Sequence, residues 1–430
     1  MRSRKILEKM ITGRWIFSVI AGVFCLSGVA EAATLTVGTC PGAGFSTVQA
    51  AVDAAKSGDI VNVCPGSYPE QVSIDKTLTV KGIAVGTQDA AVILPPVGGL
   101  VANATDPVSG LSEAAQVLVA PGVNKLKSVT LLNLVIDGTN NGVGACTPGV
   151  TGILYQNASG MVSNVVTRNQ MLAAAALSGC DSGSGIRVEA SSDVAGIKLV
   201  TVQKSTVHDY QKNGITALGN SGSIKFLSNS VRGQGPTTGG PANGIQVSFG
   251  AVGQVQDNDV IDNINIGASG FAASGILIFA SSKVRVIGNT VGNNQFGVAV
   301  ETSTTGTADK TLIKSNEIFG TLDIDGIDLC SNNNVVNSNT IASSDEAGVD
   351  LDSGCGSTGN GNKVTGNTIN EACAGILAGS GTSGNTITPN SFFNVTNITL
   401  AADVCPAAVA GTAHGKFQSG FVRPVLAPSE

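Results

Sequence analysis

The chain has 430 residues, 56 of them glycine and only 4% of them aromatic, with a formal net charge of −6. This acidic balance argues against nucleic acid or an anionic membrane surface as a partner. The scarcity of aromatic side chains argues against a strong aromatic platform for stacking sugars. The length alone would allow two domains, but the repeats described below favour one.

Residues 1–32 have the three parts of a secretory signal. A basic opening precedes the apolar run Trp15 to Val29, and Ala30-Glu31-Ala32 resembles a cleavage site before Ala33. An uncleaved membrane anchor fits less well, because this run is shorter than the roughly 20 residues that span a bilayer. We therefore expect a secreted or periplasmic protein with no membrane association after cleavage. Removing five basic and two acidic residues leaves 19 Lys and Arg against 28 Asp and Glu, a net charge of −9.

Cysteine usage indicates the same oxidising compartment. Eight cysteines follow the signal, and an even number in an exported chain predicts four disulfides. We expect sequential pairing, because each such pair would lie about one coil apart in the repeat. A zinc site is the weaker interpretation, since no Cys-x-x-Cys spacing occurs and the chain has only two histidines. The residues concerned are Cys40, Cys64, Cys146, Cys180, Cys330, Cys355, Cys373 and Cys405, with His208 and His414.

One helix is predicted, over residues 45–56. Its apolar residues Val48, Ala51, Val52 and Ala55 form one stripe. Ser46 is the expected N-cap and Gly58 the expected stop. A stack of repeats needs its end covered, and this helix is the expected cap.

A pattern N-x-[VI] recurs down most of the remaining chain. Its spacings are about 23 to 31 residues, apart from one longer gap, and Ser205 takes its place once. A repeating asparagine tolerates the left-handed backbone of a tight turn, and its amide can bond to the identical amide one coil away. Ordinary turn preference is the alternative explanation. The asparagines are Asn133, Asn164, Asn229, Asn258, Asn289, Asn316, Asn339, Asn367 and Asn390.

A second pattern, G-[IV] followed by alternating residues, trails each asparagine. Alternation with a period of two indicates strands, and coils of 20 to 30 residues bury their apolar faces by stacking on one another. The residue after each Ile or Val of this pattern is expected to face outward. This outward row is Leu154, Arg187, Thr216, Gln246, Leu277, Ala299, Asp328, Asp350 and Leu377.

The segment FSTVQAAVDAAKSGDIVNVCPGSYPEQVSIDKTLTVKG, from Phe45 to Gly82, resembles the N-terminal part of pectin-lyase-like β-helix proteins, including pectinesterases. Together with the coils, the resemblance covers about 350 residues. It implies an all-β fold, a single-stranded right-handed parallel β-helix with a short N-terminal capping helix. It does not imply an activity, because this scaffold carries lyases, hydrolases, esterases and proteins without known catalysis.

The motifs of the enzymatic branches are largely missing. No Asp-Phe pair of the pectinesterase type occurs, and none of the five arginines after the signal lies near the densest acidic stretch in sequence. The segment Asp323-Ile324-Asp325-Gly326-Ile327-Asp328 resembles the first polygalacturonase motif, and Ser344-Asp345-Glu346 stands where the second would be. The Gly-His-Gly and Arg-x-Lys motifs are absent, and His414 lies too far along the chain.

The outward row brings Asp328 and Asp350 about 5 Å apart on adjacent strands. Like charges so close repel, and one pKa should rise unless a cation or substrate hydroxyl intervenes. Three interpretations remain open: a solvated acidic face, a calcium site formed by Asp328, Asp350 and Asp352, and carboxylates for glycosidic hydrolysis. The catalytic candidates are Asp325, Asp328, Asp345 and Asp350.

Residues 33–95 are expected to form the cap and first coils, residues 96–395 the β-helix, and residues 396–430 a C-terminal tail or cap. The favoured function is a structural, adhesive or ligand-binding surface without catalysis, possibly toward polysaccharide or cell-envelope components. The alternative is a polysaccharide-active enzyme, similar to polygalacturonases or a lyase, that uses the acidic patch. Apart from calcium, no cofactor is expected.

Overall fold

The computed structural model describes residues 32–83, 91–120, 128–172, 180, 182–191, 196, 198–220, 222–237, 241–267, 272–322, 324–400 and 405. The predicted signal therefore lies outside the described residues, apart from Ala32, and stays a prediction. Within the described part, no helix has the length and hydropathy needed to cross a bilayer.

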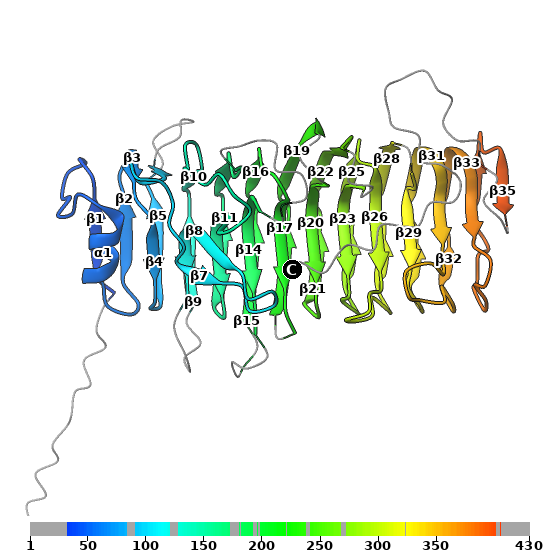
Figure 1. Ribbon diagram of the computed structural model, residues 1–430, viewed down its shortest axis with the longest axis horizontal. Coiled ribbons are helices and arrows are strands. Elements are labelled where there is room, and N and C mark those ends of the chain that lie inside the picture. The colour runs from blue at the N-terminus through cyan, green and yellow to red at the C-terminus, as the bar shows by residue number, and fades with distance from the viewer. Residues whose placement is uncertain are drawn as a thin grey trace, which may run out of the picture. The chain divides into compact units, whose positions relative to one another are not determined.

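The described residues form parallel coils with three strand faces, and successive coils stack in sequence order (Figure 1). The first face is a 12-stranded sheet in which each strand pairs with its equivalent one coil away. Its strands are β1 (Thr34–Val37), β2 (Ile60–Val63), β5 (Leu78–Gly82), β9 (Ser128–Leu132), β12 (Ser159–Ser163), β15 (Lys198–Gln203), β18 (Gly222–Leu227), β21 (Val252–Gln256), β24 (Arg285–Ile287), β27 (Leu312–Lys314), β30 (Val335–Asn337) and β32 (Lys363–Thr365).

The second face begins after the asparagine corner of each coil. Its strands are β3 (Gly66–Pro69), β6 (Ala91–Leu94), β10 (Val135–Asp137), β13 (Val166–Arg168), β16 (Thr206–His208), β19 (Ser230–Thr237), β22 (Asp259–Asn265), β25 (Thr290–Gly292), β28 (Glu317–Thr321) and β34 (Ser391–Phe393). Near the C-terminal end, β31 (Thr340–Leu351) and β33 (Thr368–Ala378) run through both the second and the third face.

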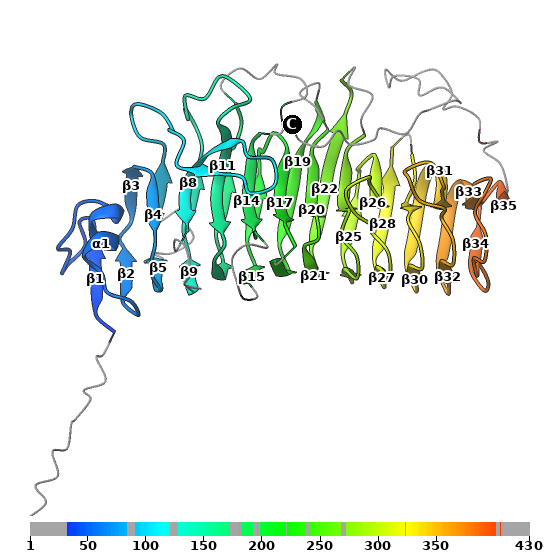
Figure 2. The same ribbon diagram turned by 60° about the horizontal axis from the view of Figure 1, so that its bottom comes forward.

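The third face carries the G-[IV] pattern. Its strands are β4 (Val72–Ile74), β8 (Ser112–Val119), β11 (Gly149–Gln156), β14 (Ser184–Glu189), β17 (Asn213–Leu218), β20 (Asn243–Ser248), β23 (Ser274–Phe279), β26 (Phe296–Glu301), β29 (Ile327–Cys330) and β35 (Asn397–Leu400). A short strand β7 (Ala104–Thr105) pairs antiparallel with β8 and makes a hairpin that leaves the coil (Figure 2). The all-β, right-handed parallel β-helix predicted from the sequence is confirmed.

The interior of the stack is a continuous aliphatic core. Equivalent residues of successive coils pair in register, as in the row Ile153, Ile186, Ile215, Ile245 and Ile276, all of them fully buried. Branched side chains suit this pleated interior, and each coil covers the apolar face of the next.

The helix α1 (Val48–Ala54) lies at the N-terminal end beside the first strands (Figure 1), as predicted for a cap. The predicted N-cap Ser46 is wrong, because Thr47 takes this role and its Oγ1 accepts from the N–H of Ala50 at 3.3 Å. The carboxylate of Glu70 accepts from the N–H groups of Val48 and Gln49, at 2.8 Å each. Since these amides have no partner inside the helix, a distant segment fixes where the helix begins. The predicted stop at Gly58 is also wrong, because Ala55 is already extended.

All four sequential disulfides are confirmed: Cys40–Cys64, Cys146–Cys180, Cys330–Cys355 and Cys373–Cys405. The bonds close loops of 24 to 34 residues, about the length of one coil. Such bonds persist outside the reducing cytosol, in agreement with a secreted or periplasmic protein.

The asparagine ladder, defined as Asn229, Asn258, Asn289, Asn316, Asn339, Asn367 and Asn390, runs along one corner of the stack. The Oδ1 of each later asparagine accepts from both the backbone N–H and the Nδ2 of the one before it, at 2.9 to 3.0 Å. Each Nδ2 also donates to a strand carbonyl, so the amide groups are satisfied.

The sequence prediction gave one asparagine two roles, and the structure divides them. The left-handed residue is the one before each ladder position except Asn390, such as Ser228 (φ 54°) and Asp257 (φ 54°). Asn133 (φ 53°) and Asn164 (φ 52°) occupy this left-handed position. They therefore lie one residue outside the buried ladder, but the predicted amide contact between coils is present there too, because the Nδ2 of Asn164 donates to the Oδ1 of Asn133 at 2.8 Å.

Replacing Asn289 by alanine tests the ladder. The change leaves the N–H and Nδ2 of Asn258 without their acceptor, and each buried group left unpaired costs about 1–3 kcal/mol. We expect a clear loss in the free energy of unfolding, measured with denaturant. Asn133→Ala should lose much less, although the sequence pattern treats both residues alike. Equal losses would contradict the ladder as the stabilising element.

Candidate functional site

The outward row of the third face pairs in the predicted register from Leu154 through Arg187 to Asp328, Asp350 and Leu377. Its side chains do not belong to the main core. They are nevertheless covered, because every member is buried except Gln246, which is half-buried. Small apolar clusters form over the row, one of them around Leu277, Ala299 and Phe296. The row is therefore a second layer of packing rather than a wet surface.

Three of the predicted acidic residues come together in this layer. Asp325, Asp328 and Asp350 are buried, and one oxygen from each lies within 4.8 Å of the others. The Asp325 carboxylate also accepts from the N–H of Ala347 at 3.0 Å. A solvated acidic face is therefore wrong for these three residues.

The remaining acidic candidates lie elsewhere. Asp345 is exposed, and Asp352 is half-buried, with its carboxylate accepting from the N–H groups of Ser353 and Gly354 in the next turn. The group of close carboxylates therefore contains Asp325 and not the predicted Asp352. Asp323 lies outside the described residues.

Carboxylate oxygens at this spacing suit calcium, which takes oxygen ligands at roughly 2.3–2.6 Å. The residues that would hold the ion are Asp325, Asp328 and Asp350. A bound cation would offset the mutual repulsion of three buried carboxylates. Calcium binding here remains a proposal.

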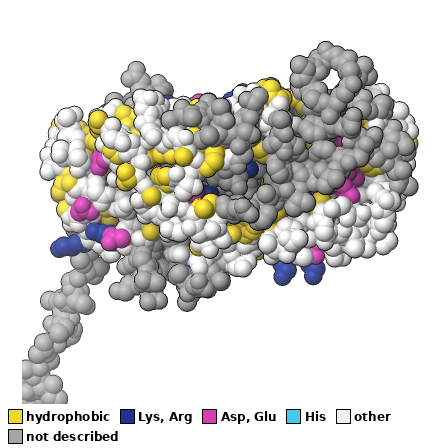
Figure 3. All heavy atoms as spheres, viewed as in Figure 1, with side chains coloured by type: hydrophobic (Ala, Val, Ile, Leu, Met, Phe, Trp, Pro, Cys, Tyr) yellow, Lys and Arg dark blue, Asp and Glu magenta, His cyan; other side chains and the backbone are white. Residues whose placement is uncertain are grey.

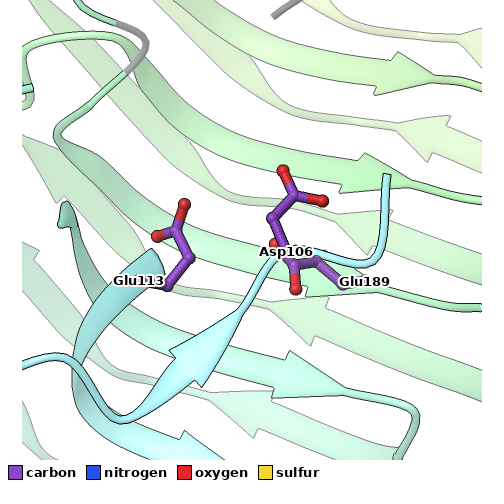
Figure 4. Close-up of side chains that lie close together, drawn as sticks. All are labelled: Asp106, Glu113 and Glu189. Atoms are coloured by element: carbon purple, nitrogen blue, oxygen red, sulfur yellow. The ribbon is translucent and has the colours of Figure 1, made fainter. Parts of the chain in front are cut away.

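A second charged group was not predicted. The Arg187 cluster consists of Arg187 and Glu189 of β14, Asp106 of the β7–β8 turn and Glu113 at the start of β8, all buried. The guanidinium contacts Glu189 and Asp106 at 2.5 Å each and Glu113 at 3.6 Å. Figure 4 shows the three carboxylates together where the hairpin crosses the coils. Glu113 also accepts from Thr151 at 3.0 Å, and Glu189 from Gln156 at 2.9 Å.

One cation faces three carboxylates in this cluster. Burial favours a neutral Arg187, but Glu189, Glu113 and Asp106 together raise the pKa of its guanidinium well above the ordinary value. Burial also raises the pKa of Glu189 to about 7, because Asp106 and Glu113 add to it and Arg187 only partly opposes it. Since the carboxyl of Glu189 ionises more readily in the unfolded chain, its contribution to stability is full at low pH and falls as the pH rises toward 7.

Little in the sequence indicates this cluster. Asp106 belongs to a hairpin turn outside the repeat, Glu113 to the strand that follows it, and both lie more than 70 residues before Arg187. The one available sign was Arg187 itself, a cation in an outward row that is otherwise apolar, polar or acidic.

An open groove of about 540 Å³ lies beside the cluster. Its floor comes from the corners that follow β14, β17, β20, β23 and β26 in successive coils, including Ala190, Asn220, Phe249, Ser282 and Thr305. Pro107 and Val108, directly after Asp106, form one wall. Glu189 of the cluster directly precedes Ala190 of the floor. Gly250 (φ 90°) keeps the floor low, because a Cβ there would overlap the Asn220 amide.

The fold and the disulfides define a right-handed parallel β-helix repeat protein. A family model described as periplasmic copper-binding protein (NosD) matches residues 234–405. None of the curated proteins matches the sequence.

Solved structures share the architecture at low identity. A DFA-IIIase from Arthrobacter chlorophenolicus A6, solved without its lid and in complex with GF2, superposes with a TM-score of 0.55 at 14% identity, covering 85% of this chain and 99% of that one. A GH136 lacto-N-biosidase from Eubacterium ramulus superposes with a TM-score of 0.57 at 12% identity, covering 86% of this chain and 68% of that one.

The matched segment does not fit the copper of the family description. Copper favours imidazole, thiolate and thioether ligands. Residues 234–405 contain no histidine and no methionine, and their four cysteines are in disulfides. The matched segment therefore lacks the ligands that copper favours.

Calcium-dependent melting tests the group of three aspartates. Calcium that binds only the folded chain raises its stability, so we expect millimolar calcium to raise the Tm. Asp328→Asn should abolish this rise, and Asp345→Asn, an exposed carboxylate on a neighbouring strand, should retain it. If millimolar calcium leaves the Tm of the native chain unchanged, the proposed calcium site is wrong.

Arg187→Met tests the second charged group. Removing the cation leaves three buried carboxylates together, at a cost of about 3–5 kcal/mol in the free energy of unfolding. The loss should be smaller at pH 5 than at pH 8, because protonation can neutralise the carboxyls. Arg232→Met is the control, since its exposed ion pair with Asp262 should contribute at most about 1 kcal/mol. Losses of equal size would argue against the cluster.

Proposed function

We propose that this protein is a secreted or periplasmic β-helix that binds an oligosaccharide in the groove without cleaving it. The observation that carries the proposal is the groove itself, which runs across the corners of five successive coils. With adjacent strands about 4.8 Å apart, four spacings give a length of about 19 Å. Such a length suits a chain molecule rather than a single sugar.

The chemistry of the groove suits sugars. Hydroxyl and amide side chains line it, among them Ser191, Asn220, Ser282 and Thr307, and these groups pair with sugar hydroxyls. Among the described lining residues only Lys283 is charged. Figure 3 shows one face of the molecule, on which the coloured side chains are mostly uncharged. The volume of the groove falls in the roughly 300–1,000 Å³ range of ligand sites.

Phe249 gives the groove an aromatic contact that the composition did not predict. It has a left-handed backbone (φ 54°), which is a strained conformation for a bulky residue. Its ring packs edge-on against Phe279, with centroids 5.5 Å apart. The same left-handed turn recurs at Asn157 (φ 52°) and Ala280 (φ 49°), so it belongs to the coil. What supports a role for this ring is its place in the lining of the groove, where the apolar face of a sugar can pack against it.

Catalysis is the alternative function. Two solved structures of similar fold are, by their names, enzymes that act on saccharides, which supports a saccharide ligand. A hydrolase needs carboxylates that reach the scissile bond. No carboxylate is among the described residues that line this groove. Binding without cleavage is therefore favoured.

Calorimetric titration with GF2 and with cellohexaose tests the proposal. We expect saturable binding to the native chain. Phe249→Ala should weaken it about three- to tenfold, the size of an aromatic contact. The control is Phe393→Ala, an exposed phenylalanine outside the groove. If the native chain binds neither sugar, oligosaccharide binding as tested is refuted. Release of reducing ends from a bound sugar would favour the catalytic alternative.

A further inference from the structure

The loop that walls the groove, residues 106–111, is folded around one side chain. Oδ1 of Asp106 accepts from the N–H groups of Val108 and Ser109, at 2.7 and 3.3 Å, and Oδ2 accepts from the Ser109 hydroxyl at 2.9 Å. The Asp106 N–H donates to the carbonyl of Leu111, and its carbonyl accepts from the N–H of Gly110. The loop is therefore a preformed unit.

This unit is tied to the coils by few polar contacts. Asp106 meets Arg187 at 2.5 Å, and the carbonyl of Thr105 accepts from Gln156 at 2.7 Å. Asp106 is 4% exposed, whereas Val108 is 42% exposed and faces the groove. One side of the loop is thus anchored by charge, and the other side is the wall.

We propose that Asp106 is a positioning residue that fixes this wall through Arg187, and that the charge on Glu189 weakens the anchor, so that oligosaccharide affinity depends on pH. The proposal rests on the proposed function, since the wall matters only if the groove binds a ligand. Beyond the groove itself, the proposal assigns a positioning role to Asp106 and a regulating role to the charge on Glu189.

The geometry explains the sign of the pH effect. Glu189 is faced by Arg187 on its own strand, by Asp106 of the loop, by Glu113 of β8 and by the amide of Gln156 on β11. While Glu189 is neutral, the positive charge of Arg187 is shared by only two carboxylates, those of Asp106 and Glu113. Glu189 contacts Nε of Arg187 and Asp106 contacts Nη2, so an ionised Glu189 does not displace Asp106, but it shares the single positive charge and repels the Asp106 carboxylate. The Glu189 pKa of about 7 places this change between pH 6 and 8.5.

Thr216 supports a second state of the cluster. It pairs with Arg187 in register on the next coil and faces the same layer. Its hydroxyl is fully buried and has no hydrogen-bond partner among the described residues. A buried hydroxyl without a partner is costly. A polar group of the cluster that shifts toward Thr216 would therefore find a hydroxyl that can donate to it or accept from it.

The test is a titration of the full chain with whichever of GF2 and cellohexaose binds the native protein more tightly. At pH 6, Asp106→Asn should bind about three- to tenfold more weakly, because the loop loses its ion pair and part of its preorganisation. The matched control is Asp137→Asn. Asp137 is also a buried carboxylate paired with an arginine, Arg168 at 2.8 Å, and it does not line the groove. This control should lose stability and keep its affinity.

The pH profile separates positioning from a merely structural role. Native affinity should fall about three- to tenfold from pH 6 to pH 8.5, and Glu189→Gln should hold the affinity of pH 6 throughout. The Glu189→Gln profile also serves if Asp106→Asn does not fold. Equal affinities for Asp106→Asn and the native chain, or a Glu189→Gln variant that still weakens with pH, would overturn the proposal. A native chain that binds neither sugar would instead overturn the groove as an oligosaccharide site.

Discussion

The stacking of coils depends on keeping each one in register with the next, and buried asparagines provide this at one corner. A parallel sheet fixes neighbours through backbone bonds, but at a corner the strands end and the backbone groups need other partners. Each ladder asparagine supplies both an acceptor for the coil before it and a donor to a strand carbonyl. The polar groups at the corner are therefore satisfied inside the buried stack, and the aliphatic rows inside the coils align as a consequence.

The outer layer follows from the same register. Because the third face repeats without slipping, residues that are 22 to 33 apart in sequence lie side by side, as Asp328 and Asp350 or Arg187 and Thr216 do. Insertions then fold over this regular surface. The β7–β8 hairpin is one of them, and it converts an exposed arginine position into a buried group of four charges.

The coils could be predicted from the sequence because their pattern is local and repeats many times. The rows of Ile and Val follow from spacing, and the one-coil separation of the cysteines favoured the sequential pairing without fixing it. The offset of Asn133 and Asn164 could not be read, because a left-handed asparagine and a ladder asparagine can produce the same N-x-[VI] pattern one residue apart. The acidic group was half predicted, since the register brought Asp328 to Asp350 but not Asp325, whose place depends on a turn. The Arg187 cluster and the groove were missed because they depend on residues outside the repeat.

The ladder does not extend through the whole stack. Its first partner is Ser205, and in the earlier coils Leu134 and Val165 occupy the equivalent corner. The N-terminal coils are instead held by apolar packing, by the capping helix and by the Cys40–Cys64 bond. The stack thus has an N-terminal block without the ladder and a ladder block in which asparagine amides link successive coils, and disulfides occur in both. Most of the groove floor lies on coils of the ladder block, whereas Ala190 of the floor and Pro107 and Val108 of the wall come from the block before it. A ligand in the groove would therefore contact both blocks.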